Sequence, residues 1–174
     1  GIFLLKGYAG TGKTTLIGAL VKTLDLLKWK CVLLAPTGRA AKVFSRYAQH
    51  PAYTIHKRIY RQRTFSNETD NFTLNQNLYQ HTLFIVDEAS MISNDGLSGM
   101  SFGTGRLLDD LIQYIYGGQG CRLMLVGDTA QLPPVGEEES PALMKEILQG
   151  YGLVPTECVL TQVVRQMNDS GILY

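Results

Sequence analysis

Residues 7–14 of this 174-residue chain are GYAGTGKT, which matches the pattern G-x-x-x-x-G-K-[ST] at every fixed position. The apolar run 2–5 before them predicts a strand, and the apolar periodicity after them predicts a helix. In such a strand-loop-helix unit, backbone N–H groups and the positive end of the helix surround a nucleotide's phosphates. Lys13 can then reach the β- and γ-phosphates, and the Thr14 hydroxyl can hold Mg²⁺. We therefore expect ATP to be bound by Gly7, Tyr8, Ala9, Gly10, Thr11, Gly12, Lys13, Thr14 and Thr15.

The composition is that of an ordinary globular domain, with 45% hydrophobic and 18% charged residues. No apolar run approaches the roughly 18 residues of a membrane span, and no signal peptide is visible, so no membrane partner is expected. Cys31, Cys121 and Cys158 lie far apart without metal-ligand spacing. We predict buried, reduced thiols in a cytosolic protein, most simply in the bacterial cytosol. Because the chain opens on Gly1, directly at a strand, it is expected to be a fragment of a longer protein.

Charge is distributed unevenly along the chain, although the net charge is only +1. No acidic residue lies between Leu26 and Asn67, so this block carries +9 and the remainder −8. The asymmetry indicates a polyanion partner such as nucleic acid, with a solvated basic face as the alternative. The nine basic residues are Lys28, Lys30, Arg39, Lys42, Arg46, Lys57, Arg58, Arg61 and Arg63.

The first half of the chain predicts two helices around a short strand, 31–35. The periodicity of residues 13–27 places Leu16, Ile17, Leu20, Val21 and Leu24 on one helical face. Thr37 can cap a second helix, 38–49, which carries Arg39, Lys42 and Arg46 on one face. Its core face would hold Ala40, Val43, Phe44 and Tyr47. A short helix after Thr54 would carry His56, Lys57, Arg58 and Arg61, and the polar stretch 62–80 suggests a small β-hairpin insertion.

The second half continues the alternation of strands and helices. Strands are expected at 83–86, 123–126 and 157–161, a helix before Gly117-Gly118, and a short helix at 142–149. This alternation predicts an α/β fold with a mostly parallel sheet and ligands at the carboxyl ends of its strands. The residues at or just beyond those ends are Gly7, Pro36, Asp87, Asp128 and Thr161.

The polar residues at these ends suggest ATP hydrolysis. Asp87 can complete the Mg²⁺ shell with Thr14, and Glu88 can orient and deprotonate the attacking water. The alternative is that the Asp87-Glu88 pair caps the next helix. Gln131 can sense the γ-phosphate, or its amide can simply bond the backbone. Arg165 can stabilise charge on the transferring phosphate, although a structural salt bridge is an equal alternative.

Six segments together carry a family resemblance: GYAGTGKTT, LLAPTGRAAK, TIHK, FIVDEASMI, LMLVGDTAQLPPVG and LTQVVRQ. With them the chain resembles the first RecA-like motor domain of superfamily 1 DNA helicases that move 5′ to 3′, especially the alpha subunit of exodeoxyribonuclease V. The resemblance implies a P-loop NTPase fold with a five-stranded sheet in the order 5-1-4-3-2. It assigns catalytic roles to Lys13, Glu88, Gln131 and Arg165, and metal binding to Thr14 and Asp87.

The resemblance also implies that Thr37, Arg39, Thr54 and His56 line a path for single-stranded DNA, and the basic block adds Lys42 and Lys57 as phosphate contacts. Residues 62–80 would correspond to a pin-bearing insertion. The implied partners are DNA junctions, a second RecA-like domain and nuclease or helicase subunits, in recombination or repair. The adenine-contacting segment and that second domain are absent from this sequence, so the 174 residues alone are expected to be weakly active or inactive.

Two other functions remain open at this point. One is a PhoH-like P-loop ATPase acting on RNA, with the same ATP elements and the basic helices turned to RNA. The other is an ATP-gated nucleic-acid clamp without productive hydrolysis, which the presence of Glu88 and Gln131 argues against.

Overall fold

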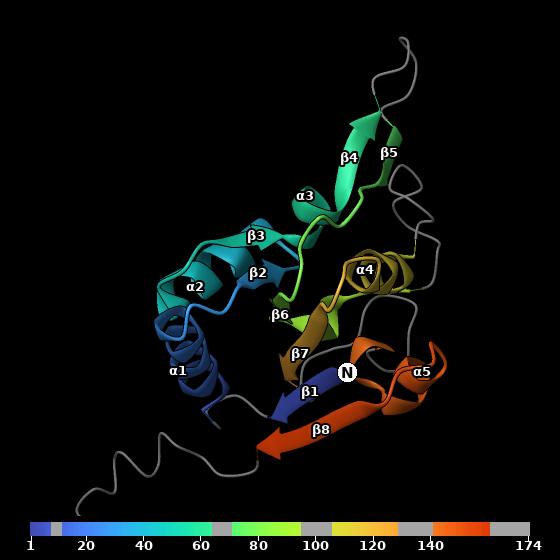
Figure 1. Ribbon diagram of the computed structural model, residues 1–174. Helices are drawn as coiled ribbons and strands as arrows, with labels where there is room; N and C mark the ends of the chain where they lie inside the picture. The colour runs from blue at the N-terminus through green and yellow to red at the C-terminus, as the bar shows by residue number, and fades with distance from the viewer. Residues whose placement is uncertain (8–11, 64–70, 95–105, 129–140, 161–174) are drawn as a thin grey trace, which may run out of the picture.

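A six-stranded, all-parallel sheet forms the centre of the molecule (Figure 1). The structure is a computed structural model, and it describes residues 1–7, 12–63, 71–94, 106–128 and 141–160. The strand order is β3-β2-β6-β7-β1-β8. Their bounds are β1 (Ile2–Gly7), β2 (Cys31–Ala35), β3 (Ala52–Thr54), β6 (Leu83–Val86), β7 (Arg122–Asp128) and β8 (Pro155–Leu160).

The five strands expected from the sequence are present in the expected order. Numbered along the chain without β3, they run 5-1-4-3-2 from β8 to β2, which confirms that prediction. The sheet has a sixth strand that was not predicted. This is β3, a three-residue strand that pairs with β2 at the edge of the sheet, with Leu33 opposite Ala52. Three residues are too few to show an alternating pattern, so the sequence carries no strand signal there.

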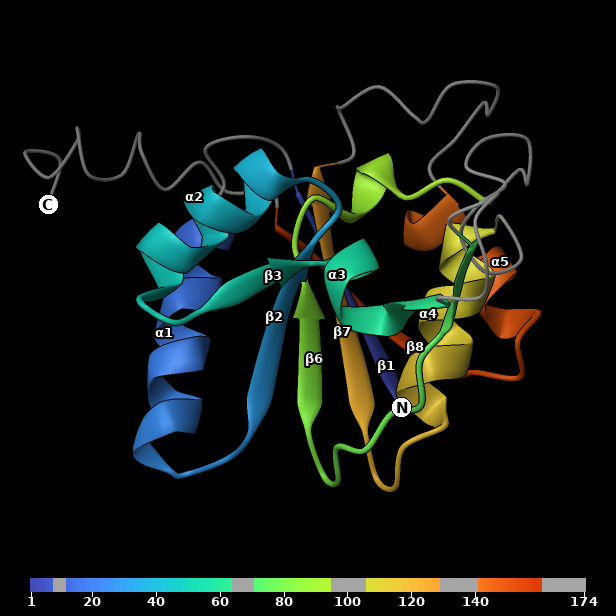
Figure 2. The ribbon, with the colours of Figure 1, turned by 90° about the horizontal axis from the view of Figure 1, so that it is seen from above.

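Helices cover both faces of the sheet (Figure 2). On one face lie α1 (Lys13–Leu26) and α2 (Gly38–Ala48), and on the other α4 (Leu107–Tyr116) and α5 (Lys145–Gln149). Successive strand residues point to opposite faces, so Leu33 and Ile85 pack with α1 and α2, while Leu34 and Phe84 pack with α4 and α5. Two short 3-10 helices are also present. The first, η1 (Ala89–Met91), comes shortly after β6, and η2 (Pro141–Leu143) precedes α5.

Helices α1 and α2 bury narrower stripes than the periodicity suggested. In α1, Ile17 and Val21 are buried, whereas Leu16 is 45% exposed. In α2 the buried stripe is Ala41, Phe44 and Ala48, at positions i, i+3 and i+7, so Val43 falls off the stripe and is 52% exposed. The predicted core position of Val43 is therefore wrong, and Leu16 lies at the exposed margin of the apolar face predicted for α1. Apolar character alone did not determine the angle at which each helix meets the sheet.

A second, two-stranded sheet projects from the main body (Figure 1). It pairs β4 (Tyr60–Arg63) antiparallel with β5 (Asn71–Leu74), directly after the short helix α3 (Ile55–Ile59). Arg61 therefore lies on β4 and not on the helix, because the helix ends at Ile59. The Tyr60 hydroxyl donates a 2.6 Å hydrogen bond to the buried carboxylate of Asp110 on α4. This contact ties the base of the projection to the main domain.

The predicted hairpin range 62–80 overlaps these strands, and residues 64–70 lie outside the described part of the chain. Within the described ranges, no helix combines the length and the apolar character that a membrane crossing requires.

Candidate nucleotide-binding site

Polar residues from several strands meet at the carboxyl edge of the parallel sheet. Gly7, the last residue of β1, is in register with Asp128, the last residue of the neighbouring β7. Asp87 directly follows β6, and β6 pairs with β7 on the side of β7 that faces away from β1. Parallel strands place all their carboxyl ends at one edge, so these three residues share that edge, as predicted. Thr161, expected beyond β8, lies outside the described residues.

Helix α1, which follows the phosphate-binding motif of residues 7–14, begins at the same edge of the sheet. Its N-cap, Gly12, has a φ of 92°, a left-handed conformation that glycine adopts without a Cβ penalty. Lys13 begins α1, and its ammonium group donates a 2.8 Å hydrogen bond to the carbonyl of Gly7. The Lys13 ammonium group therefore lies next to the last residue of β1. Thr14 and Thr15 are exposed in the first turn of α1, where the positive end of the helix favours anions. The other motif residues, Tyr8 to Thr11, lie outside the described ranges.

Within the described residues, Asp87 accepts one hydrogen bond at each carboxylate oxygen. Its Oδ1 accepts from the backbone N–H of Glu88 at 2.8 Å, and its Oδ2 accepts from the Tyr47 hydroxyl at 2.6 Å. The Thr14 hydroxyl and this carboxylate are hard oxygen ligands, the donor type that Mg²⁺ prefers. By donor type, the two residues are therefore candidate ligands for a magnesium ion that keeps most of its water ligands.

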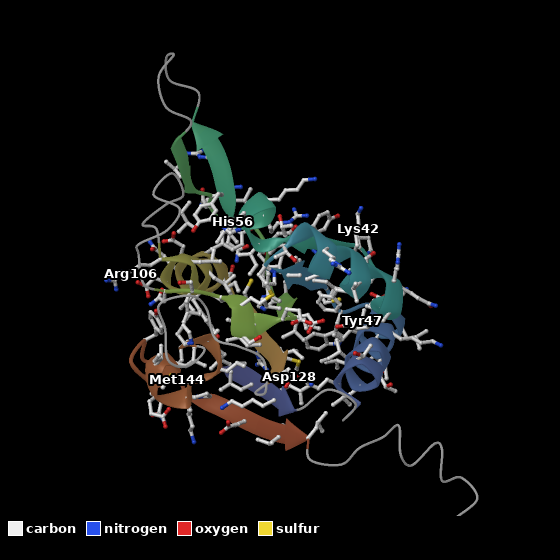
Figure 3. All side chains as sticks on the ribbon, turned by 180° about the vertical axis from the view of Figure 1, so that it is seen from behind. Lys42, Tyr47, His56, Arg106, Asp128 and Met144 are labelled. Atoms are coloured by element: carbon white, nitrogen blue, oxygen red, sulfur yellow. The ribbon has the colours of Figure 1, made fainter. Side chains whose placement is uncertain are left out.

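Tyr47 was expected in the core of α2, and its hydroxyl contact was not foreseen. Its ring stacks on Phe44, with centroids 5.2 Å apart, and α1 passes close by at Gly18. A Cβ at Gly18 would lie 3.2 Å from the Tyr47 carbonyl oxygen. Burial and the charge of Asp87 raise the pKa of Tyr47 well above its usual value, so the hydroxyl stays protonated and donates. Figure 3 shows Tyr47 reaching from α2 toward the sheet.

Glu88 adopts a backbone conformation that is uncommon for a residue with a side chain. Its φ is 54° and its ψ 37°, in the left-handed region, and it stands as the N-cap of η1. Its side chain makes no capping hydrogen bond to η1, so capping does not account for the carboxylate. Strained backbone of this kind concentrates at functional sites and is stabilised by the surrounding fold. Both residues of the pair remain at the sheet edge.

The residues expected on a DNA path divide into two groups. Thr37 accepts a hydrogen bond from the Ala40 N–H at 3.1 Å, and Thr54 accepts one from the Lys57 N–H at 3.2 Å. Both threonines thus cap helices, α2 and α3, as the sequence predicted for Thr37. The cap at Thr54 was not predicted, because its helix is only five residues long and shows little periodicity.

The cationic side chains lie on the outer surfaces of these helices. Arg39 and Lys42 on α2 and Lys57 on α3 are exposed. Figure 3 shows Lys42 on the outer side of α2 and His56 at α3. His56 is half-buried beside Tyr60, and burial lowers the pKa of its imidazole, which favours the neutral form at pH 7.

The Arg58 guanidinium contacts other side chains of this domain. Its guanidinium lies 4.1 Å from the centre of the Tyr53 ring and donates to the Tyr79 hydroxyl at 3.1 Å. One basic residue of the block therefore serves local packing. Gln131 and Arg165, the other predicted catalytic residues, lie outside the described residues, so their roles stay predictions.

The cysteines differ from the expectation of three buried thiols. Cys121 is buried, Cys31 is half-buried, and Cys158 is exposed. Cys158 lies on β8, an edge strand with exposed residues on both sides of it, so its apolar neighbourhood in the sequence did not imply burial.

The fold has a counterpart among solved structures. The structure of a Bacteroides sp. Pif1 in complex with ADP-AlF4 superposes with a TM-score of 0.55 at 23% sequence identity, covering 94% of this chain and 38% of that one. This likeness concerns the fold alone, and it agrees with a P-loop NTPase domain whose sheet is RecA-like.

Sequence comparison gives two informative relatives. The ATP-dependent RecD2 DNA helicase of Deinococcus radiodurans is 31% identical over 135 residues, 77% of this chain and 16% of the relative. The multifunctional conjugation protein TraI of Escherichia coli K12 is 31% identical over 161 residues, 84% of this chain and 8% of the relative. The chain thus spans a small part of the length of either protein. Residues 1–172 match the family model described as an AAA domain, and the chain therefore belongs to the AAA domain family.

Proposed function

We propose that this chain is the ATPase motor domain of a superfamily 1 DNA helicase that binds and hydrolyses Mg-ATP to move along single-stranded DNA and to unwind duplexes. The supporting observation is the carboxyl edge of the sheet. The Lys13 ammonium group lies at this edge, at the start of α1. The Asp87-Glu88 pair lies at the same edge, directly after β6. Similarity to a RecD2 DNA helicase over most of the chain agrees with this function.

Each residue at the edge has a role that its placement allows. Lys13 would move from the Gly7 carbonyl to the β- and γ-phosphates, exchanging one oxygen acceptor for another. Thr14 and Asp87 would hold the magnesium ion, which neutralises charge on the phosphates. Glu88 would orient the attacking water and accept its proton. Gln131 would contact the γ-phosphate and Arg165 the charge that develops on it.

A nucleic-acid path over α2 and α3 completes the proposal. Arg39, Lys42 and Lys57 are exposed cations from a stretch without acidic residues, and they suit phosphate contacts. Thr37 and Thr54 are the N-caps of the two helices, where first-turn backbone N–H groups and the threonine hydroxyls would also contact phosphates. His56, neutral at pH 7, would contribute stacking or a hydrogen bond rather than charge. The projecting β4–β5 sheet would act at the duplex junction.

Finer assignments rest on the six sequence motifs. They favour the branch of 5′-to-3′ motors that includes the alpha subunit of exodeoxyribonuclease V, a cytosolic role in recombination or repair, and action with a second RecA-like domain. Nuclease or helicase subunits are the further partners that this branch suggests.

Replacing Glu88 by glutamine tests the hydrolytic part of the proposal. In the full-length protein, Glu88→Gln should bind Mg-ATP with nearly unchanged affinity and lower turnover by about 10²-fold or more, because a positioned base is removed while the shape is kept. Lys13→Ala should weaken both binding and turnover. Steady-state ATPase and nucleotide-binding titrations measure the two effects separately.

The matched control is Glu146→Gln, the same substitution at an exposed position on α5. It should leave both quantities unchanged. Wild-type turnover in Glu88→Gln would remove Glu88 from the mechanism.

A further inference from the structure

Three side chains with metal-binding atoms meet at the amino end of β2, at the opposite edge of the sheet from the nucleotide site. Asp25 lies in the last turn of α1, Cys31 is the first residue of β2, and His50 follows the end of α2. Their ligand atoms all lie within 4.8 Å of one another. We propose that Asp25, Cys31 and His50 form a binding site for a thiophilic divalent cation of the Zn²⁺ class.

The backbone brings the three residues together through ordinary pairing. Leu33 on β2 is opposite Ala52 on β3, and the same parallel register, continued two residues back, sets His50 opposite Cys31. Two residues with positive φ make the adjoining turns, Lys28 at 59° after α1 and Gln49 at 51° after α2. Three separate segments thus converge on one point, where sequence spacing shows no motif.

Two of the three distances between ligand atoms are close to those of a tetrahedral zinc site, and the third, from Cys31 Sγ to Asp25, is at most 4.8 Å. Cys31 Sγ lies 3.8 Å from His50 Nε2, and His50 Nε2 lies 3.7 Å from Asp25 Oδ1. With Zn–S near 2.3 Å and Zn–N or Zn–O near 2.1 Å, tetrahedral ligands stand about 3.4–3.6 Å apart. A small rotation of side chains would therefore close the set around one ion. A water or an external ligand would occupy the fourth position, as in zinc sites with three protein ligands.

The imidazole of His50 is oriented as a ligand. Its Nδ1 lies 3.0 Å from the carbonyl oxygen of Pro51, which can only accept, so Nδ1 carries the proton. Nε2 then presents its lone pair toward Cys31 and Asp25 when the ring is neutral. A backbone carbonyl on the second ring nitrogen is the arrangement that fixes the tautomer of metal-bound histidines.

The lone pair of Nε2 faces both the Cys31 thiol and the Asp25 carboxylate, so a cation placed among the three would be close to all of these ligand atoms. The cation can be a proton on His50 or a metal ion. The thiol distinguishes the two, because a metal ion takes the thiolate as its ligand whereas a proton does not. Burial and the Asp25 charge raise the pKa of the Cys31 thiol to about 11, so a metal ion would displace the thiol proton on binding. Apparent affinity should then rise about tenfold per pH unit while the thiol is the only group losing a proton.

Cobalt and zinc titrations of the full-length protein test the site without nucleotide and in excess Mg²⁺, so that the magnesium site does not contribute. We expect one Co²⁺ per chain, a sulfur-to-cobalt charge-transfer band, tetrahedral d–d bands, and displacement of Co²⁺ by Zn²⁺. Cys31→Ser should abolish the charge-transfer band. His50→Gln should lower Zn²⁺ affinity by about tenfold or more, since even a supporting residue of a metal site costs that much.

Matched controls are available elsewhere in the chain. Cys158→Ser removes an exposed cysteine and His81→Gln an exposed histidine, and both should bind the metal ions like the wild type. If Cys31→Ser fails to fold, Asp25→Asn serves instead, because Asp25 is 48% exposed on the helix surface and its replacement should weaken binding without unfolding the chain.

Absence of a sulfur-to-cobalt band in the wild-type protein would overturn the proposal. So would a band that persists in Cys31→Ser and disappears in Cys158→Ser. Neither result depends on ATP hydrolysis, so the experiment tests the metal site independently of the proposed motor function.

Discussion

Tyr47 is the residue that links the basic helix α2 to the candidate magnesium ligand. Its hydroxyl donates to Asp87 Oδ2, while the backbone of Glu88 donates to Oδ1, so the carboxylate is oriented from two sides. A hydrogen bond to a charged group contributes about 1.5–3 kcal/mol. Tyr47 therefore acts as a positioning residue for Asp87 and ties its orientation to the helix that carries Arg39 and Lys42.

Substitution of Tyr47 by phenylalanine should separate this role from packing. Tyr47→Phe keeps the ring stacked on Phe44 but removes the donor to Asp87. We expect the Mg²⁺ concentration for half-maximal ATPase to rise by about 10-fold or more, because supporting residues of a metal site typically act at that scale. The magnesium dependence of steady-state ATPase gives the value.

A matched control is Tyr116→Phe, whose hydroxyl donates to the Gly1 carbonyl instead. Its magnesium dependence should equal that of the wild type. An unchanged magnesium dependence in Tyr47→Phe would show that the hydroxyl hydrogen bond does not matter for the metal.

At the scale of single residues, the sequence predicted which residues follow a strand end better than it predicted their side-chain contacts. An apolar run that stops at Val86 predicts that Asp87 and Glu88 follow a strand end, and the structure has them there. The partner of Asp87 could not be predicted, since Tyr47 lies 40 residues away and its helical periodicity suggested only a core position. The Asp25, Cys31 and His50 cluster escaped for the same reason, because pairing of β2 with β3 brings its members together.

Helices α2 and α3 are the elements that would carry the nucleic-acid path, and salt dependence tests them. Removing Arg39 and Lys57 together, by alanine, should weaken binding of single-stranded DNA. It should also lower the slope of log affinity against log salt by about 0.7 for each phosphate that is no longer neutralised. Base composition of the strand should have little effect. Fluorescence anisotropy over a series of salt concentrations measures affinity and slope together.

A double variant with the same charge change serves as the control. Lys28 and Lys30 are exposed cations of the same basic block, located between α1 and β2 at the opposite edge of the sheet. Lys28→Ala with Lys30→Ala should leave the slope almost unchanged. Equal effects of the two double variants would mean that the block acts only through its overall charge.

Elements with strong patterns were predicted well, and short elements were not. The buried strands β1, β2, β6 and β7 showed as apolar runs, and glycine or proline marked several of their ends. Strand β3 and the exact end of α3 depend on pairing and packing, which three to five residues cannot encode by periodicity. The exposure of Leu16 and Val43 depends on how α1 and α2 lie on the sheet, which is a property of the tertiary structure.

At the scale of the whole molecule, one edge of the sheet would serve ATP and the outer surfaces of α2 and α3 would serve nucleic acid, and Tyr47 joins the two. This arrangement suits a motor domain in which the bound nucleotide changes the affinity for the nucleic-acid strand. An RNA-directed ATPase would share the nucleotide edge but prefer RNA at the helices. A clamp would bind both ligands without turnover.

Steady-state ATPase of the full-length protein, measured without nucleic acid, with single-stranded DNA and with RNA, tests the central claim most directly. A DNA motor predicts low turnover alone, strong stimulation by single-stranded DNA and much weaker stimulation by RNA of the same length. Stimulation by RNA in preference to DNA, or nucleotide binding with no turnover under any of the three conditions, would contradict it.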